Sequence, residues 1–259
     1  MSNRPEQATD AVGAGPLARF CAAVAEDLRA LALLHDRELE RDMLLSLRKD
    51  CYEDFLGLEL RGAKGREALA LFREGLSDIP SALDQGTLDI LAAEFADIYL
   101  NNGLGTSPCE SVWLDEDGLI MQEPMFQIRQ WYRRYGVAVE DWRKRTDDHL
   151  VNQLQFLAIL LETEPGAERL EAAARFMDEH LLRWIEEFGE RVATRSQVRF
   201  YAGLAFLTAA YLGELRDLMA ELLGSPRPSA EEIEERMHPK AGVAVAGPAP
   251  FVPGAAPTW

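Results

Sequence analysis

Positively charged residues are scarce in this chain of 259 residues. It contains 27 Lys and Arg against 44 Asp and Glu, which gives a formal net charge of −17 at pH 7. Binding to nucleic acid depends on clustered Lys and Arg that neutralise phosphates. The deficit therefore argues against nucleic acid as a partner and favours a cationic one, although acidity also serves simply to keep a protein in solution.

Cysteine and histidine are also few, with three Cys and four His in the chain. Cys21, Cys51 and Cys109 lie far apart and form no C-x-x-C pair, so neither a disulfide framework nor a zinc ribbon is predicted. A reducing compartment fits this usage. No H-E-x-x-H motif joins the scattered histidines, and we therefore expect no protein-bound metal. The histidines are His35, His149, His180 and His238.

Long hydrophobic runs are missing too. Outside the Pro/Gly/Ala-rich C-terminal stretch, the longest uncharged run is Phe200–Gly213, which suits a buried core helix, because a helix that spans a bilayer needs about 20 apolar residues. The N-terminal sequence M-S-N-R-P-E-Q-A-T-D has no apolar segment of the kind found in secretory signals. We therefore expect a cytoplasmic location, with at most transient association with a membrane.

Motifs of nucleophilic catalysis and of phosphate binding are absent as well. Ser111 lies in C-E-S-V-W rather than in G-x-S-x-G, and Cys109 has no local catalytic signature. Gly103 and Gly105 form only a fragment of a Gly-rich loop, because the chain contains no G-x-x-x-x-G-K-[ST] motif. We expect no enzyme and no bound cofactor, and weak binding of GTP stays open.

What the chain has in abundance is helical periodicity. Apolar residues recur at steps of three and four, as on the buried face of an amphipathic helix. This pattern predicts helices at 16–31, 39–55, 67–76, 84–100, 122–136, 150–161, 167–188 and 201–222. Residues 62–65 are expected to break the pattern, and only 111–114 has any strand character.

The predicted fold class is therefore all-α, a single-domain helical bundle over residues 16–224. A loose, polar tail at 1–15 precedes it. A Pro/Gly/Ala-rich tail at 225–259 follows, with a possible short acidic helix at 229–237. That tail has too little apolar surface to order itself alone.

The stretch from Pro108 to His149 departs from the pattern, because its first part is loop-like, acidic and aromatic. It holds five carboxylates and no Lys or Arg between positions 110 and 123: Glu110, Asp115, Glu116, Asp117 and Glu123. Hydrophobic residues are interleaved with them: Trp113, Leu119, Ile120, Met121, Met125 and Phe126. Such a surface matches a ligand with a basic end and an apolar segment. A solvated acidic loop over the core is the alternative.

The triplet Asp147-Asp148-His149 has two interpretations. It could provide a general acid and base or part of a metal site. It also stands where a helix begins, so that Thr146 or Asp147 could cap the free N–H groups of the first turn. Both can hold, because a capped helix end presents its first side chains in fixed directions.

Five motifs in order suggest a known family. They are P-C-E-S-V-W-L-D-E-D at 108–117, E-P-M-F-Q-I-R-Q-W-Y-R-R-Y-G at 123–136, D-D-H-L-V-N-Q-L-Q-F-L at 147–157, H-L-L-R-W at 180–184 and F-Y-A-G-L-A-F-L-T-A at 200–209. Their order and spacing resemble the TorD/DmsD family of cytoplasmic chaperones for molybdenum-cofactor enzymes. The resemblance covers roughly residues 18–224.

The resemblance implies an all-helical chaperone that binds the twin-arginine signal peptide of a partner oxidoreductase and delays its export until the cofactor is inserted. The family's P-x-x-S-V-Y/W loop falls on residues 108–113 and its D-H signature on Asp148 and His149, and both regions are implicated in peptide recognition in relatives. The H-L-x-x-W signature, at 180–184, is expected to be structural. The peptide-binding set predicted here is Pro108, Cys109, Glu110, Ser111, Trp113, Asp147, Asp148 and His149.

Two features depart from the family pattern: Cys109 stands where some relatives carry an aromatic residue, and the tail after Gly224 is not a family feature. The expected partners are the signal peptide and the catalytic subunit of a molybdoenzyme, with the chaperone a monomer or a homodimer. The alternative is a maturation factor that holds GTP or a molybdopterin nucleotide with Gly103, Gly105 and Asp148.

Overall fold

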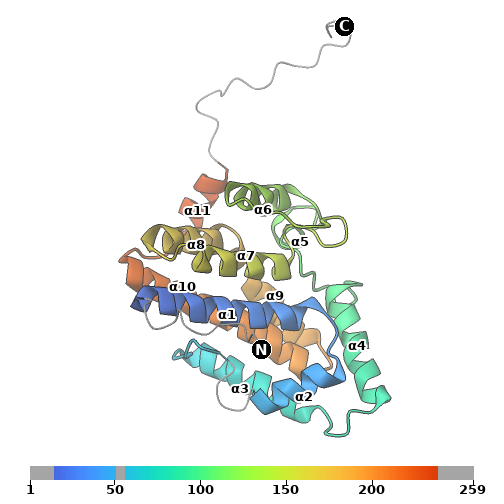
Figure 1. The fold of residues 1–259 in the computed structure, drawn as a ribbon. Helices are drawn as coiled ribbons and strands as arrows, with labels where there is room; N and C mark the ends of the chain where they lie inside the picture. The colour runs from blue at the N-terminus through green and yellow to red at the C-terminus, as the bar shows by residue number, and fades with distance from the viewer. Residues whose placement is uncertain (1–14, 51–55, 239–259) are drawn as a thin grey trace, which may run out of the picture. The chain divides into compact units, whose positions relative to one another are not determined.

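The computed structural model describes residues 15–50 and 56–238, and every regular element in this part of the chain is a helix (Figure 1). The prediction of an all-α fold is confirmed. The elements are α1 (Pro16–Asp36), α2 (Arg41–Asp50), α3 (Ala63–Asp78), α4 (Gln85–Tyr99), α5 (Ser111–Leu114), α6 (Glu123–Arg134), α7 (Leu150–Glu162), α8 (Ala167–Glu179), the 3₁₀ turn η1 (Leu181–Arg183), α9 (Ile185–Arg195), α10 (Arg199–Leu223) and α11 (Ala230–Met237).

The chain divides into two compact units, residues 1–227 and 228–259. The first unit contains α1 to α10. In the second, α11 occupies the stretch where a short acidic helix was predicted. Ser229 begins this helix with a capping box, because its hydroxyl accepts from the backbone N–H of Glu232 while the Glu232 carboxylate accepts from the N–H of Ser229. The segments 1–14, 51–55 and 239–259 lie outside the described residues.

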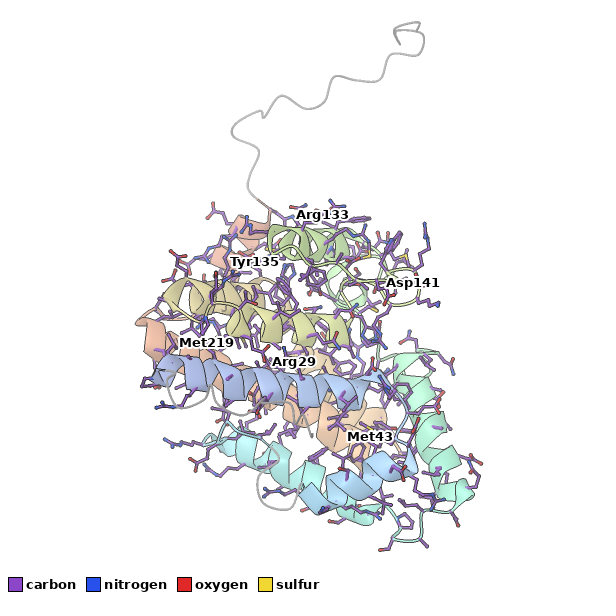
Figure 2. The ribbon with its side chains drawn as sticks, viewed as in Figure 1. Arg29, Met43, Arg133, Tyr135, Asp141 and Met219 are labelled. Carbon is purple, nitrogen blue, oxygen red and sulfur yellow. The ribbon has the colours of Figure 1, made fainter. Side chains whose placement is uncertain are left out.

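The longest helix, α10, forms the centre of the first unit. It packs against α3, α8 and α9, while α1 packs against α7 and α7 against α8. In its predicted apolar stripe Tyr201, Leu212 and Met219 are fully buried, whereas Leu222 at its C-terminal end is exposed. Arg29 of α1, labelled in Figure 2, forms a solvent-exposed ion pair with Glu162 at the end of α7.

Two glycines allow α3 and α10 to approach closely. A Cβ atom on Gly203 would lie 2.6 Å from the Cα atom of Phe72, and one on Gly75 would lie 2.6 Å from the backbone nitrogen of Phe200. Neither backbone can yield to a side chain at these distances. The pair of glycines therefore sets the separation of the two helices.

The predicted helix at 167–188 is wrong in one respect, because it is interrupted. α8 ends at Glu179, and η1 separates it from α9. His180 has φ −127° and ψ −85°, outside the helical region. Its ring contacts Glu110 from a distant loop, and this contact overrides the local helical preference of the sequence.

Two smaller predictions are also wrong. The segment Ser111–Leu114 is a short helix, not a strand, because Asp148 accepts from the N–H that begins it. The expected break at 62–65 is narrower than predicted, since Gly62 precedes α3 and Gly65 lies inside it. A Cβ atom on Gly65 would clash with the side chains of Leu60 and Glu214, so this position needs a glycine for packing. Of the helix predicted at 39–55, the structure describes Arg41–Asp50.

Within the described ranges, no helix is both long and apolar enough to cross a membrane.

Candidate peptide-binding site

The segment that precedes α5 and the segment that precedes α7 are far apart in sequence and lie side by side in the structure. Cys109 and His149 form an isolated antiparallel bridge. The N–H of Glu110 donates to the carbonyl of Asp148 at 3.1 Å, and the N–H of Leu150 donates to the carbonyl of Pro108 at 2.7 Å. The structure thus brings together the 108–113 loop and the 147–149 triplet that the sequence singled out.

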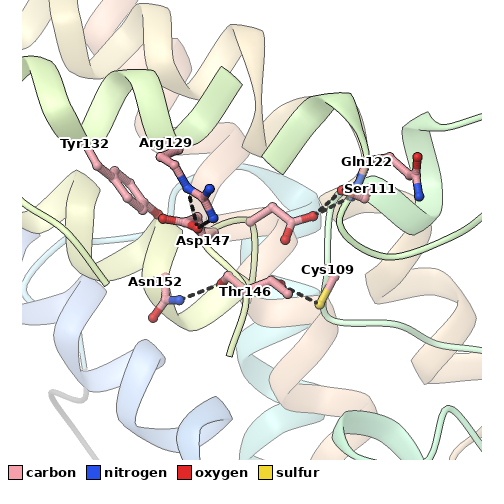
Figure 3. Close-up of polar contacts among 9 residues, drawn as sticks. Cys109, Ser111, Gln122, Arg129, Tyr132, Thr146, Asp147 and Asn152 are labelled. Atoms are coloured by element: carbon pink, nitrogen blue, oxygen red, sulfur yellow. Dashed lines mark hydrogen bonds and ion pairs between the residues drawn. The ribbon is translucent and has the colours of Figure 1, made fainter. Parts of the chain in front are cut away.

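Asp148 holds α5 in place. Its Oδ2 atom accepts from the backbone N–H of Ser111 at 2.8 Å and from the Ser111 hydroxyl at 2.6 Å. The backbone N–H of Gln122 in turn donates to the Ser111 hydroxyl at 3.3 Å (Figure 3). Asp148 and Ser111 are fully buried. Through these bonds one carboxylate fixes the start of α5 and the loop that follows it.

Glu110 and His180 form a second buried contact in the site. Nδ1 of His180 lies 2.8 Å from Oε1 of Glu110, and both residues are 0% exposed. Burial raises the pKa of Glu110, and the neighbouring His180 offsets only part of that rise. His180, which the sequence suggested to be structural, therefore anchors the loop that carries the predicted peptide-binding residues.

Trp113 is half-buried and lies against α9. Its indole N–H donates to the carbonyl of Ser107 at 2.8 Å. Its ring is 6.2 Å from that of Trp184, with 28° between the planes, and the guanidinium of Arg191 lies 4.3 Å from its centroid. These contacts orient the ring through stacking and a cation–π interaction.

Asp147 forms an ion pair with Arg129 of α6, with distances of 2.7 Å and 3.1 Å to two guanidinium nitrogens (Figure 3). The Tyr132 hydroxyl donates to the carbonyl of Asp147 at 2.8 Å. Arg129 also lies over the rings of Phe126 and Trp142, at 5.5 Å and 4.7 Å. The charge of Asp147 is thus already compensated inside the protein.

His149, and not Thr146 or Asp147, caps α7, so that part of the capping prediction is wrong. Its Nδ1 atom accepts from the backbone N–H of Val151 at 3.2 Å. Burial, with a contribution from Arg145, lowers the pKa of His149 to about 3, and the ring is neutral at pH 7. A proton-transfer role at neutral pH does not fit this environment.

Cys109 is similarly unreactive. Burial, together with the nearby carboxylate of Asp148, raises the pKa of its thiol to about 12. Its sulfur lies 3.4 Å from the hydroxyl of Thr146. The residue packs between the two segments of the site as a small apolar group.

The residues predicted to bind the peptide therefore stabilise the loop at 108–113 from inside the protein and offer little exposed surface. All of them except Trp113 are buried. Their carboxylates bond inside the protein, Asp148 to Ser111, Glu110 to His180 and Asp147 to Arg129. The predicted acidic loop differs from expectation at Glu110, which lies inside with His180. Glu116 and Asp117, shortly after α5, and Glu123, at the start of α6, are exposed.

A groove of about 450 Å³ lies beside the 146–149 segment. Apolar side chains of Val137, Val139 and Phe156 line it, with Asn152 among the polar ones. Asn152 donates to the carbonyl of Thr146 at 2.7 Å. The volume falls in the range of small-ligand or side-chain pockets.

Gly103 and Gly105, which were considered for nucleotide binding, lie in the loop that connects α4 to α5. Arg195 donates to the carbonyl of Leu104 at 2.6 Å, and Arg191 donates to that of Gly105 at 3.1 Å. Gly105 has φ +62°, which favours glycine. Among the described residues, no group of three or more His, Cys, Asp or Glu is arranged to hold a metal ion.

Comparison with known proteins gives consistent matches. A family described as nitrate reductase delta subunit matches residues 59–190, about half of the chain. A relative named Chaperone protein TorD, from Vibrio cholerae serotype O1 (strain ATCC 39541 / Classical Ogawa 395 / O395), is 33% identical over 141 residues, covering 51% of this chain and 64% of the relative.

The chain belongs to the TorD/DmsD family. Chaperone protein TorD of Vibrio vulnificus (strain YJ016) is 33% identical over 129 residues, covering 47% of this chain and 60% of the relative. The Probable Tat proofreading chaperone DmsD of Haemophilus influenzae is 25% identical over 131 residues, covering 50% and 62%. The matches span less than two thirds of the length of these relatives.

Sequence reasoning missed Arg129 and Arg191, which contact Asp147 and Trp113. Each lies on an amphipathic helix, where an arginine usually faces solvent, and no local motif marks its partner. A weak signal existed for Trp184, because it shares the H-L-x-x-W motif with His180, and both residues of that motif hold the 108–113 loop.

Proposed function

We propose that this chain is a non-enzymatic, system-specific chaperone that binds the twin-arginine signal peptide of a molybdenum-cofactor oxidoreductase in the cytoplasm. In this role it would assist cofactor insertion into the catalytic subunit and delay its export. Family membership supports the class, since the relatives it matches are named chaperones.

One observation carries the proposal. The carboxylate of Asp148 joins the two segments implicated in peptide recognition in the family, because it holds Ser111 at 2.6 Å and 2.8 Å. The chain then continues from α5 into a segment with exposed Glu116, Asp117 and Glu123. Paired arginines of a signal peptide favour carboxylates of this kind through charge-assisted hydrogen bonds.

The charge of the whole chain supports the same partner. With a net charge of −17, the protein attracts cationic peptides over distances of about 10 Å at moderate ionic strength. The buried cysteine and histidine of the site, with pKa values of about 12 and about 3, suit a binding role better than catalysis.

The test is a fluorescence-anisotropy titration with labelled signal peptides of molybdoenzymes. Each peptide is compared with a version in which both arginines are replaced by glutamine. We expect saturable binding that depends on the arginine pair. Asp148→Ala should weaken it, since the start of α5 loses its acceptor, while Asp141→Ala, which removes an exposed carboxylate, serves as the control.

Circular dichroism and thermal melting establish that each variant is folded, and Asp148→Asn, which keeps an acceptor oxygen, provides a milder second variant. Absence of binding to any arginine-paired peptide by the folded wild-type protein would contradict the proposal. Equal affinity for the glutamine versions would also contradict it.

A further inference from the structure

Three of the eight large hydrophobic residues that are exposed in the described part of the chain are close together in sequence. Leu119, Ile120 and Phe126 are 55%, 51% and 46% exposed, and they lie within one short stretch. The other large exposed hydrophobic residues are scattered along the chain: Leu33, Leu45, Ile90, Leu100 and Leu222. Single exposed apolar residues are ordinary, whereas a cluster points to an interaction site. We call Leu119, Ile120 and Phe126 the apolar patch.

The backbone under the apolar patch is held in an uncommon conformation. Met121 has φ +62°, in the left-handed region, which residues other than glycine rarely adopt. Gly118 has the same φ. The neighbouring amides are nevertheless fixed, since the N–H of Gly118 donates to Asp115 at 3.1 Å and that of Gln122 donates to Ser111 at 3.3 Å. Leu119 and Ile120 therefore stay exposed on a hydrogen-bonded loop, and Phe126 follows in the first turn of α6.

Negative charge borders the apolar patch. Glu116, Asp117 and Glu123 are exposed within the same stretch. No Lys or Arg occurs from position 110 to position 128. The nearest cation in the sequence, Arg129, is paired with Asp147 at 2.7 Å, so it does not offset these carboxylates. The surface therefore combines apolar contact area with carboxylates that form no ion pair within the described part of the chain.

We propose that the apolar patch is the docking site for the hydrophobic segment of the signal peptide, with the paired arginines on Glu116, Asp117 and Glu123. This rests on the proposed function and assigns the peptide to residues outside the 108–113 and 147–149 segments. The Asp148 network then acts as the support that fixes the patch, through Ser111 and Gln122.

The same carboxylates argue against two other occupants. A second copy of this chain placed on the patch about a twofold axis would bring like charges together, which is unfavourable. An anionic lipid surface would be repelled for the same reason. A segment that is both basic and apolar satisfies both parts of the surface.

The test compares the variant Leu119→Ser/Ile120→Ser/Phe126→Ser with the wild-type protein in the peptide titration. We expect affinity to fall by at least about tenfold, because three apolar contacts are lost. The matched control, Leu33→Ser/Ile90→Ser/Leu222→Ser, removes three exposed apolar side chains elsewhere and should bind as the wild type does. Leu119→Ser/Ile120→Ser leaves Phe126 and its contact with Arg129 in place and should weaken binding in the same direction.

A charge variant separates the two halves of the surface. Glu116→Gln/Asp117→Asn/Glu123→Gln should weaken binding at low salt and make the remaining affinity less sensitive to salt.

Unchanged affinity of the triple serine variant would overturn the inference and leave the proposed function standing, since the wild type still binds. A wild type that binds no signal peptide would instead remove the proposed function. The inference would also be overturned if the wild type were a dimer, the triple serine variant were a monomer and both bound the peptide equally well. The apolar patch would then be a self-association surface.

Discussion

The ring of His180 and the carboxylate of Glu110 meet inside the protein, with Nδ1 2.8 Å from Oε1 and no exposed surface on either residue. This contact joins the junction of α8 and η1 to the turn that begins α5. It explains why the helical pattern of residues 167–188 is interrupted at His180. It also means that the loop at 108–113, which we propose to support peptide binding, is anchored by a residue at the end of α8, far away in the sequence.

Removing one partner of this pair should destabilise the protein strongly. His180→Leu leaves the Glu110 carboxyl buried without its partner, and we expect a loss of about 3 kcal/mol or more in the free energy of unfolding. The double variant Glu110→Leu/His180→Leu should lose less than the sum of the single variants, because no polar group is then left unpaired. Urea unfolding of all four proteins measures this coupling. Strictly additive losses would show that the two residues do not interact.

The ion pair between Asp178 and Arg216 should matter for stability more than surface pairs do. Both guanidinium contacts are 2.9 Å, and both side chains are at most 5% exposed. Asp178→Ala leaves the Arg216 charge buried and should cost about 3–5 kcal/mol. Glu59→Ala breaks a pair with Arg61 of the same length that is largely exposed, and should leave the unfolding midpoint nearly unchanged. Similar losses in the two variants would contradict the burial argument.

Acid should destabilise the fold through His35 and His149. Burial lowers the pKa of each to about 3, whereas unfolded histidine titrates near 6.5. Below pH 6.5 the unfolded chain therefore binds protons that the folded chain does not. The stability that these groups contribute is fully present above pH 6.5 and is lost as the pH falls toward 3, by up to about 1.4 kcal/mol per pH unit for each residue.

The variant His149→Asn isolates one of these contributions. Asparagine is a good N-cap, so the start of α7 keeps its acceptor while the titrating ring is removed. Urea unfolding at pH 7.5 and pH 5 gives the free energy of unfolding at each pH. The decrease in this free energy from pH 7.5 to pH 5 should be smaller for the variant than for the wild type. The raised pKa of Glu110 acts in the opposite direction and is common to both proteins. An equal decrease in the variant and in the wild type would indicate that His149 is protonated in the folded state at pH 5.

Close packing of α3 and α10 predicts opposite effects for two glycines of one helix. Gly203→Ala places a methyl group 2.6 Å from the backbone of Phe72 and should cost about 1–3 kcal/mol. Gly213→Ala meets nothing within 4 Å and should stabilise α10 by about 0.5–1 kcal/mol. Thermal unfolding of the two variants checks the sign of each change. A stable Gly203→Ala protein would mean that the helices separate at little cost.

Much of the fold was predictable, because helical periodicity is a local property. Leu28 in α1, Leu157 in α7 and Leu212 in α10 lie on predicted faces and are fully buried. The ends of helices were also recognisable where a residue has a local role. Asp84, for example, caps α4 by accepting from the N–H of Thr87 at 2.8 Å.

The sequence singled out two segments that the structure brings together, but it indicated only part of the contacts within them. Motif order brought the 108–113 and 147–149 segments to attention, and they do meet. The inward position of Glu110 was not predictable, because its loop has no regular period and its partner His180 is distant in sequence. The pairing of Arg129 with Asp147 depends in the same way on how the chain folds.

Backbone hydrogen–deuterium exchange, with and without a saturating twin-arginine peptide, tests the central claim most directly. The exposed acidic and apolar segment should bind the peptide, so amides at 113–126, among them those of Gly118 and Gln122, should exchange more slowly in the complex. Protection confined to another surface, such as the groove lined by Val137 and Val139, would contradict the account. So would unchanged exchange at 113–126 when the peptide is bound.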